Sequence, residues 1–255
     1  MRQDDLKFNF GCASCGYKGS DTPEGHIDLC RMTARLDSLL DTEDYSAADR
    51  LLCYWRGEAQ ALRDRKGELS VVSEQLGLYR KMLQKEPAEE AVDRALALIE
   101  ELDVADTVGG ATVLLNAATT MKAFGAAERA LPYYERARAV YEKELSPDDT
   151  RLAGLYNNYA LALADLHRAE EAETLYRRAI AITEKTVEGR WDAAISLINL
   201  AHLYDGSRDE LIPDCIVQAI EYLTCPPEKQ NGYYRYVLSK CEPSLRLFGF
   251  SPDFS

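Results

Sequence analysis

Large apolar residues recur at steps of three and four positions through most of this chain, with polar residues between them. Steps of three and four place side chains along one face of an α-helix, whereas a β-strand would show strict alternation. The clearest examples are Tyr156, Tyr159, Leu163 and Leu166, followed by Ala172, Leu175, Tyr176, Ala179 and Ile182. The pattern therefore predicts pairs of amphipathic helices and an all-α fold.

The two-helix pattern returns at an interval of 41 or 42 residues. In the first helix of a pair, Asn116 is followed by Asn158 and then by Asn199. The second helices repeat as Ala88, Val92 and Ala95, then Ala130, Tyr134 and Ala137, then Ala172, Tyr176 and Ala179. Self-similarity at a fixed spacing of this length is typical of helical repeat arrays.

Turn, capping and small residues fit this division. Within 146–150, a proline can stop one helix and an aspartate or threonine can cap the next. Gly109 and Gly110 are predicted to form a break between two helices. Ala118, Ala160 and Ala201 are predicted to lie where the first helix of a pair meets the second, because alanine lets helix axes approach closely.

These positions resemble the tetratricopeptide repeat, with bulky–x–x–bulky–Ala in the first helix and Ala–x–x–x–aromatic–x–x–Ala in the second. The unit is longer than the usual length of about 34 residues and is most similar to the long repeats of kinesin light chains and their bacterial relatives. The resemblance implies a right-handed α-solenoid of about five helix pairs with a C-terminal capping helix. The expected domains are a Cys-containing segment at 1–25, repeats over 26–225 (about 26–66, 68–105, 110–145, 152–187 and 192–224), and the capping helix and tail at 226–255.

The resemblance also implies a concave groove lined by the first helices. Asn116, Asn158 and Asn199 would form a column along it, with Glu74 at the upstream position. A carboxamide can bond a peptide C=O and N–H together, so the column could hold an extended polypeptide; alternatively, these asparagines brace neighbouring helices. The candidate peptide-binding residues are Glu74, Thr112, Asn116, Thr119, Asn157, Asn158, Asp165, Asn199 and His202.

A separate cluster of candidate metal ligands lies near the N-terminus. Cys12, Cys15, His26 and Cys30 have the spacing C-x2-C-x10-H-x3-C, and thiolates and imidazole are the ligands of structural zinc sites. This predicts a structural zinc ion as the one candidate cofactor. The alternatives are thiols on a segment packed against the first repeat and a redox pair at Cys12 and Cys15.

Charge and composition narrow the class of partner and the compartment. The formal net charge is −13, which argues against a general binder of nucleic acid or of an anionic membrane. The sequence shows neither the apolar run of a signal peptide nor a stretch of about 20 apolar residues that could span a membrane. Seven scattered cysteines indicate a reducing compartment, and a cytoplasmic location is expected.

The sequence favours binding over catalysis. Its three histidines, His26, His167 and His202, are not spaced with a nucleophile or acid as in known catalytic arrangements, and no Gly-rich phosphate loop occurs. The expected function is a scaffold or adaptor that binds a protein or peptide in the groove. Two alternatives are a peptide-sensing module that acts on a separate effector and a zinc-stabilised subunit that self-assembles.

Overall fold

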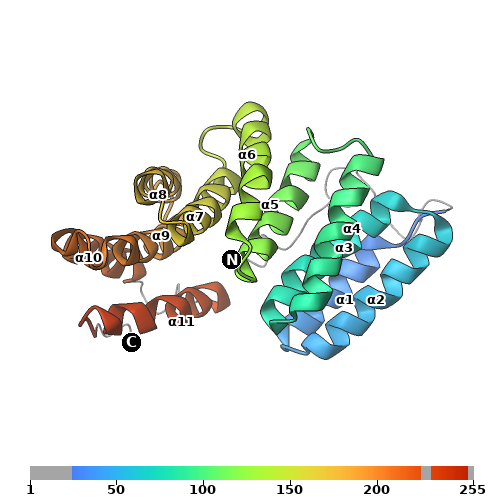
Figure 1. Cartoon of the computed structure of the whole chain (residues 1–255). Helices are drawn as coiled ribbons and strands as arrows, with labels where there is room; N and C mark the ends of the chain where they lie inside the picture. Colours follow the sequence, from blue (N-terminus) through green and yellow to red (C-terminus); the bar gives the residue numbers. More distant parts are fainter. Residues whose placement is uncertain (1–24, 225–230, 252–255) are drawn as a thin grey trace. The chain divides into compact units, whose positions relative to one another are not determined.

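The computed structural model describes residues 25–224 and 231–251, and these residues form α-helices and one short 3-10 helix, with no strand among them (Figure 1). The chain divides into two compact units, residues 1–141 and 142–255, which are described separately below. The all-α class predicted from the apolar spacing is confirmed, as is the solenoid of successive helix pairs.

The first unit holds six helices, the last of which runs slightly past the boundary: α1 (Leu29–Asp41), α2 (Tyr45–Leu62), α3 (Arg65–Met82), α4 (Lys85–Glu101), α5 (Val108–Ala123) and α6 (Ala127–Glu144). Within it, α3 contacts the helices before and after it and also contacts α5, the first helix of the next pair. This is the neighbour-to-neighbour packing of a repeat array.

The second unit holds α7 (Thr150–Asp165), α8 (Ala169–Thr183), α9 (Gly189–Tyr204), the 3-10 helix η2 (Asp209–Leu211), α10 (Ile212–Leu223) and α11 (Gly232–Leu247). Here α9 contacts α7, α8, α10 and α11. The helix α11 buries Tyr234, Val237, Cys241 and Leu245. It therefore covers one side of α9, as a capping helix would.

The small residues singled out by the repeat are all at zero exposure: Ala118, Ala160, Ala201, Ala130 and Ala172. The aromatic residues beside them are buried as well, with Tyr134 at 0% and Tyr176 at 1% exposure. Small and large side chains thus alternate in the core, which lets helix axes approach while the rings fill the remaining space.

Asp64 joins the start of α1 to the start of α3. Its carboxylate caps α3 by accepting from the Gly67 backbone N–H at 3.0 Å, and it also accepts from the Ile27 backbone N–H at 3.0 Å. A Cβ on Gly67 would lie 2.2 Å from the same carboxylate. Glycine is therefore required at this position by close packing.

A fully buried carboxylate links three helices of the first unit. Glu68 on α3 accepts from Arg94 on α4 at 2.7 and 2.8 Å, from Gln60 on α2 at 2.8 Å and from Arg65 at 3.0 Å. Burial alone would raise the pKa of Glu68, but the hydrogen bonds from Arg94, Gln60 and Arg65 outweigh it and lower that pKa to about 2. The ionised form is thus the one that the fold stabilises.

Gly109 and Gly110 do not form the break that the sequence suggested, because α5 begins at Val108 and includes both. Thr107 instead caps the helix by accepting from the Gly110 N–H at 3.0 Å. A Cβ at Gly110 would lie 1.9 Å from the Val104 carbonyl oxygen. The helix starts so close to the preceding loop that only glycine fits.

We expect Gly110→Ala to lower the free energy of unfolding by at least about 2 kcal/mol, because backbone would have to move. Gly57, inside α2, provides the matched control, since no atom lies within 4 Å of a Cβ placed there. Gly57→Ala should stabilise by about 0.5–1 kcal/mol through helix propensity. Urea titrations of the three proteins, followed by circular dichroism, measure both changes. Equal effects of the two substitutions would contradict the close approach at Gly110.

The buried carboxylate predicts a pH dependence of stability. Because the pKa of Glu68 is lowered in the folded state, its contribution to stability is present above the unfolded pKa and is lost as pH falls from about 5 towards 2. Glu68→Gln should therefore be much less stable than the wild type at pH 7, with the difference shrinking below about pH 4. Exposed Glu128→Gln is the control. A Glu68→Gln deficit that persists unchanged at the acid end of the titration would contradict this account.

Candidate functional site

The asparagine of α5 is hydrogen-bonded to the preceding first helix. Asn116 Nδ2 donates to Ser73 Oγ of α3 at 3.2 Å, across 43 residues of sequence. Arg80 of α3 donates to the backbone carbonyl oxygen of Asn116 at 3.1 Å and to Thr120 Oγ1 at 3.3 Å. Asn116 therefore braces two successive first helices in the first unit.

The asparagine of α9 makes the equivalent bond in the second unit. Asn199 Nδ2 donates to Asn157 Oδ1 of α7 at 3.0 Å, across 42 residues. Ser196 Oγ donates to the same oxygen at 3.2 Å. Asn157, predicted as a groove residue, thus accepts two bonds from the next first helix, and Asn199 is also a bracing residue.

Asn158 differs from the other two members of the column. It is half-buried on α7, and its side chain forms no hydrogen bond with any residue that the structure describes. Asn116 and Asn199 are thus bonded within their own units, whereas Asn158 is bonded to none of the described residues.

Thr112 and Thr119 lie towards the second helix of their own pair. The Thr112 hydroxyl is hydrogen-bonded to the Tyr141 hydroxyl of α6, and Thr119 Oγ1 accepts from the Tyr134 hydroxyl at 3.2 Å. Both positions were predicted to share the face of Asn116. At about 100° per residue, however, they are rotated by roughly 40–60° from Asn116 in the same direction, which turns them towards α6.

The remaining candidates lie in three different environments. Glu74 is only 7% exposed, within a run of α3 that is buried from Gly67 to Tyr79. Asp165 is exposed at the end of α7. The pKa of the Tyr176 phenol is raised by the burial of that ring and, to a smaller extent, by the nearby Asp165 carboxylate. His202 Nε2 lies 2.8 Å from Ser244 Oγ, and its ring centroid lies 4.9 Å from that of Phe248. His202 on α9 therefore contacts the capping helix α11 and the phenylalanine that follows it.

The candidate zinc ligands are only partly covered by the structure. Cys12 and Cys15 lie outside the described residues. His26 Nδ1 lies 3.1 Å from Asp64 Oδ1, and Cys30 is disulfide-bonded. A sulfur in a disulfide cannot also bind zinc as a thiolate, so the two states of Cys30 exclude each other. Within the described ranges no three His, Cys, Asp or Glu side chains are grouped to hold a metal, and the zinc site stays a prediction.

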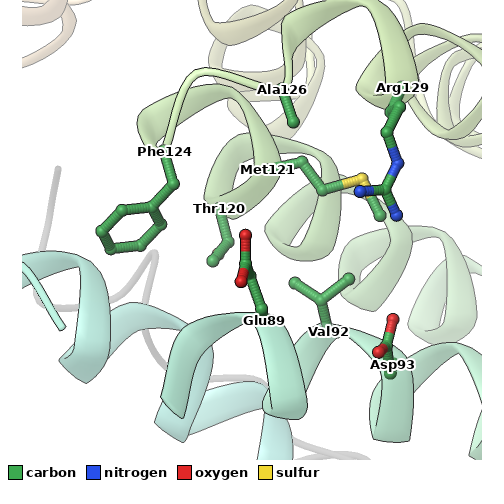
Figure 2. Close-up of a pocket in the computed structure, with 8 residues that line it drawn as sticks. All are labelled: Glu89, Val92, Asp93, Thr120, Met121, Phe124, Ala126 and Arg129. Carbon is green, nitrogen blue, oxygen red and sulfur yellow. The ribbon is translucent and has the colours of Figure 1, made fainter. Parts of the chain in front are cut away.

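A pocket that the sequence did not indicate lies among α4, α5 and the start of α6 (Figure 2). Its volume is about 190 Å³, and its lining comprises Glu89, Val92, Asp93, Thr120, Met121, Phe124, Ala126 and Arg129. Glu89 and Asp93 are one helical turn apart, but the pocket exists only because three helices meet there. Sequence spacing within one helix could not reveal it.

Comparison with known proteins identifies the repeat. Residues 111–150 and residues 151–210 each match a family model described as tetratricopeptide repeat. No curated protein sequence gives a match. No helix in the described part of the chain is long and apolar enough to cross a membrane.

Solved structures show the same fold. The crystal structure of BtubC (BKLC) from P. vanneervenii has a TM-score of 0.67 at 23% identity, covering 80% of this chain and 85% of that one. Kinesin-light-chain TPR-like repeats from Podospora anserina have a TM-score of 0.64 at 19% identity, covering 80% and 97%. A single-substitution form of the Podospora repeats has a TM-score of 0.61 at 19% identity, covering 86% and 100%. The predicted long repeat of kinesin-light-chain type is thus confirmed at the level of the fold.

The unequal bonding of the asparagines predicts unequal effects on stability. Asn→Ala raises helix propensity at either position, so Asn158→Ala should leave the free energy of unfolding unchanged or raise it slightly. Asn199→Ala also loses the bond to Asn157, so it should be less stable than Asn158→Ala by about 1 kcal/mol. Urea titrations of the two variants measure the difference. An equal stability of both would show that the Asn199 bond does not support the fold.

Proposed function

Because the chain is a tetratricopeptide-repeat protein, we propose that it is a scaffold or adaptor that holds an extended polypeptide segment against its first helices. Tetratricopeptide repeats generally mediate protein–protein interaction, and such repeat families are typically non-catalytic. Stacked helix pairs offer long surfaces suited to that purpose.

Asn158 is the observation that carries the proposal. Asn116 and Asn199 use their Nδ2 groups to brace neighbouring helices, whereas the Asn158 carboxamide bonds to none of the described residues. A free carboxamide offers two donors and one acceptor oxygen, which matches the N–H and C=O of an extended main chain. Asn158 is therefore the member of the column that is available to a ligand.

Two residues of α7 within about 40° of Asn158 around the helix are exposed, and with it they form a line that a backbone could approach closely. Gly154, one turn before Asn158, is exposed, and no atom lies within 4 Å of the Cβ position. Asp165, two turns after Asn158, is exposed and carries a negative charge. A segment passing along this line would meet a small residue, an amide and an acid in turn. With the net charge of −13, this order favours a segment that carries a basic side chain.

The two alternatives remain distinguishable by their consequences. A peptide sensor that acts on a separate effector would use the same line of α7, and it would in addition change conformation on binding. A zinc-stabilised self-assembling subunit would depend on the N-terminal cysteines and on protein concentration. No feature of the described residues favours either one over simple binding.

The test begins with peptides selected from a random library displayed on phage, because the natural partner is unidentified. Affinities of the selected peptides are then measured by fluorescence anisotropy against the wild type, Asn158→Ala and Asn199→Ala. We expect Asn158→Ala to weaken binding about tenfold or more, since two main-chain hydrogen bonds would be lost while the fold is retained.

Asn199→Ala is the matched control, because it removes the same kind of side chain from a position where the carboxamide is already hydrogen-bonded to Asn157. It should change affinity by less than about threefold, on the order of 0.5 kcal/mol. Peptides that bind Asn158→Ala as tightly as the wild type, or a folded protein that selects no peptide at all, would refute the proposal.

A further inference from the structure

The pocket of Figure 2 combines an apolar floor with a charged rim, entirely within the first unit. Val92 on α4 and Met121 on α5 are buried at 4% and 7% exposure, and Phe124 is half-buried. These three side chains form the apolar floor, which presents aliphatic, thioether and aromatic groups. A long unbranched side chain would make favourable contacts along this floor.

The rim on α4 is negatively charged. Glu89 and Asp93 are both exposed and stand four residues apart, so their carboxylates lie on the same side of the helix. Helix α4 as a whole carries six acidic and two basic residues between Lys85 and Glu101, a net charge of −4. A cation at the mouth of the pocket would therefore be stabilised from this side.

Arg129, at the opposite rim, already places a cation at the mouth of the pocket. Its side chain extends from α6 over the pocket, with the guanidinium beside Met121 (Figure 2). Within the described part of the chain, Arg129 forms no ion pair with Glu89 or Asp93, and Glu89 instead has the exposed Lys85 Nζ at 3.9 Å. An exposed arginine without a fixed partner can move aside at little cost, because its side chain is flexible and hydrated.

We propose that this pocket binds a lysine or arginine side chain presented by a basic segment of another protein. The aliphatic stem packs against Val92 and Met121, and the Glu89 and Asp93 carboxylates receive its charged end, while Phe124 bounds the pocket on the side of Glu89. Arg129 acts as an internal competitor for the same place.

The chemistry of the lining separates this ligand from others. An anionic side chain would be repelled by the two carboxylates and by the net charge of −13. A purely apolar side chain would fill the floor but would partly desolvate Glu89 and Asp93 without compensation. The inference goes beyond the groove proposal, because it concerns different helices and does not require Asn158 to bind anything.

Methionine methyl groups provide a direct readout. The chain has four methionines, of which Met121 lines the pocket and Met32 is buried in the core of the first pair. Protein labelled with methyl-13C-methionine would be titrated with the N-acetyl methylamides of lysine, arginine, norleucine and glutamate. We expect saturable shifts of the Met121 methyl, with no change at Met32, for the two cations alone.

Substitutions at the two rims of the pocket should change the affinity for lysine in opposite directions. Glu89→Gln/Asp93→Asn should weaken binding of the lysine probe about fivefold or more, whereas Arg129→Gln should strengthen it by about twofold or more. Glu100→Gln/Asp103→Asn removes the same charge from residues that do not line the pocket and should have little effect. Overturning results would be an unmoved Met121 methyl, an equal response to norleucine, or equal weakening by the control pair.

Discussion

Close packing between the first helices of successive pairs within each unit is the constraint on which the rest of the structure depends. It is seen between α3 and α5 in the first unit and between α7 and α9 in the second. Ala118, Ala160 and Ala201, on α5, α7 and α9, are at zero exposure, so these helices are packed closely against their neighbours. Because the helices are close, their register is fixed to within a residue, and side chains 42 or 43 positions apart meet. A larger side chain at these buried alanines would push neighbouring helices apart.

This register gives the same residue type two different tasks. Asn116 finds Ser73 and Asn199 finds Asn157, so both carboxamides are used inside the fold. Asn158, in the repeat between them, is bonded to none of the described residues. Bracing is therefore observed for Asn116 and Asn199, and binding is what we propose for Asn158.

The fold was predictable because period, apolar spacing and small residues are local properties that repeat, and each copy confirms the others. The groove residues were less predictable from the sequence. Thr112 and Thr119 were assigned by helix geometry alone, which gives an angle but not the neighbour that it points to; the phenols of Tyr141 and Tyr134 occupy that side. The pocket around Met121 depends on three helices meeting, and the network around Glu68 depends on further contacts across helices, neither of which leaves a spacing in the sequence.

NMR of the side-chain amides in protein labelled with 15N-asparagine can separate the bracing role of Asn116 and Asn199 from the binding role proposed for Asn158. Solvent exchange of each NH2 group reports whether it is held in a hydrogen bond. We expect slowed exchange for Asn116 and Asn199, rapid exchange for Asn158, and slowing of Asn158 alone when a selected peptide is added. Equal protection of all three in the free protein, or an Asn158 amide that the bound peptide leaves unchanged, would contradict this division of roles.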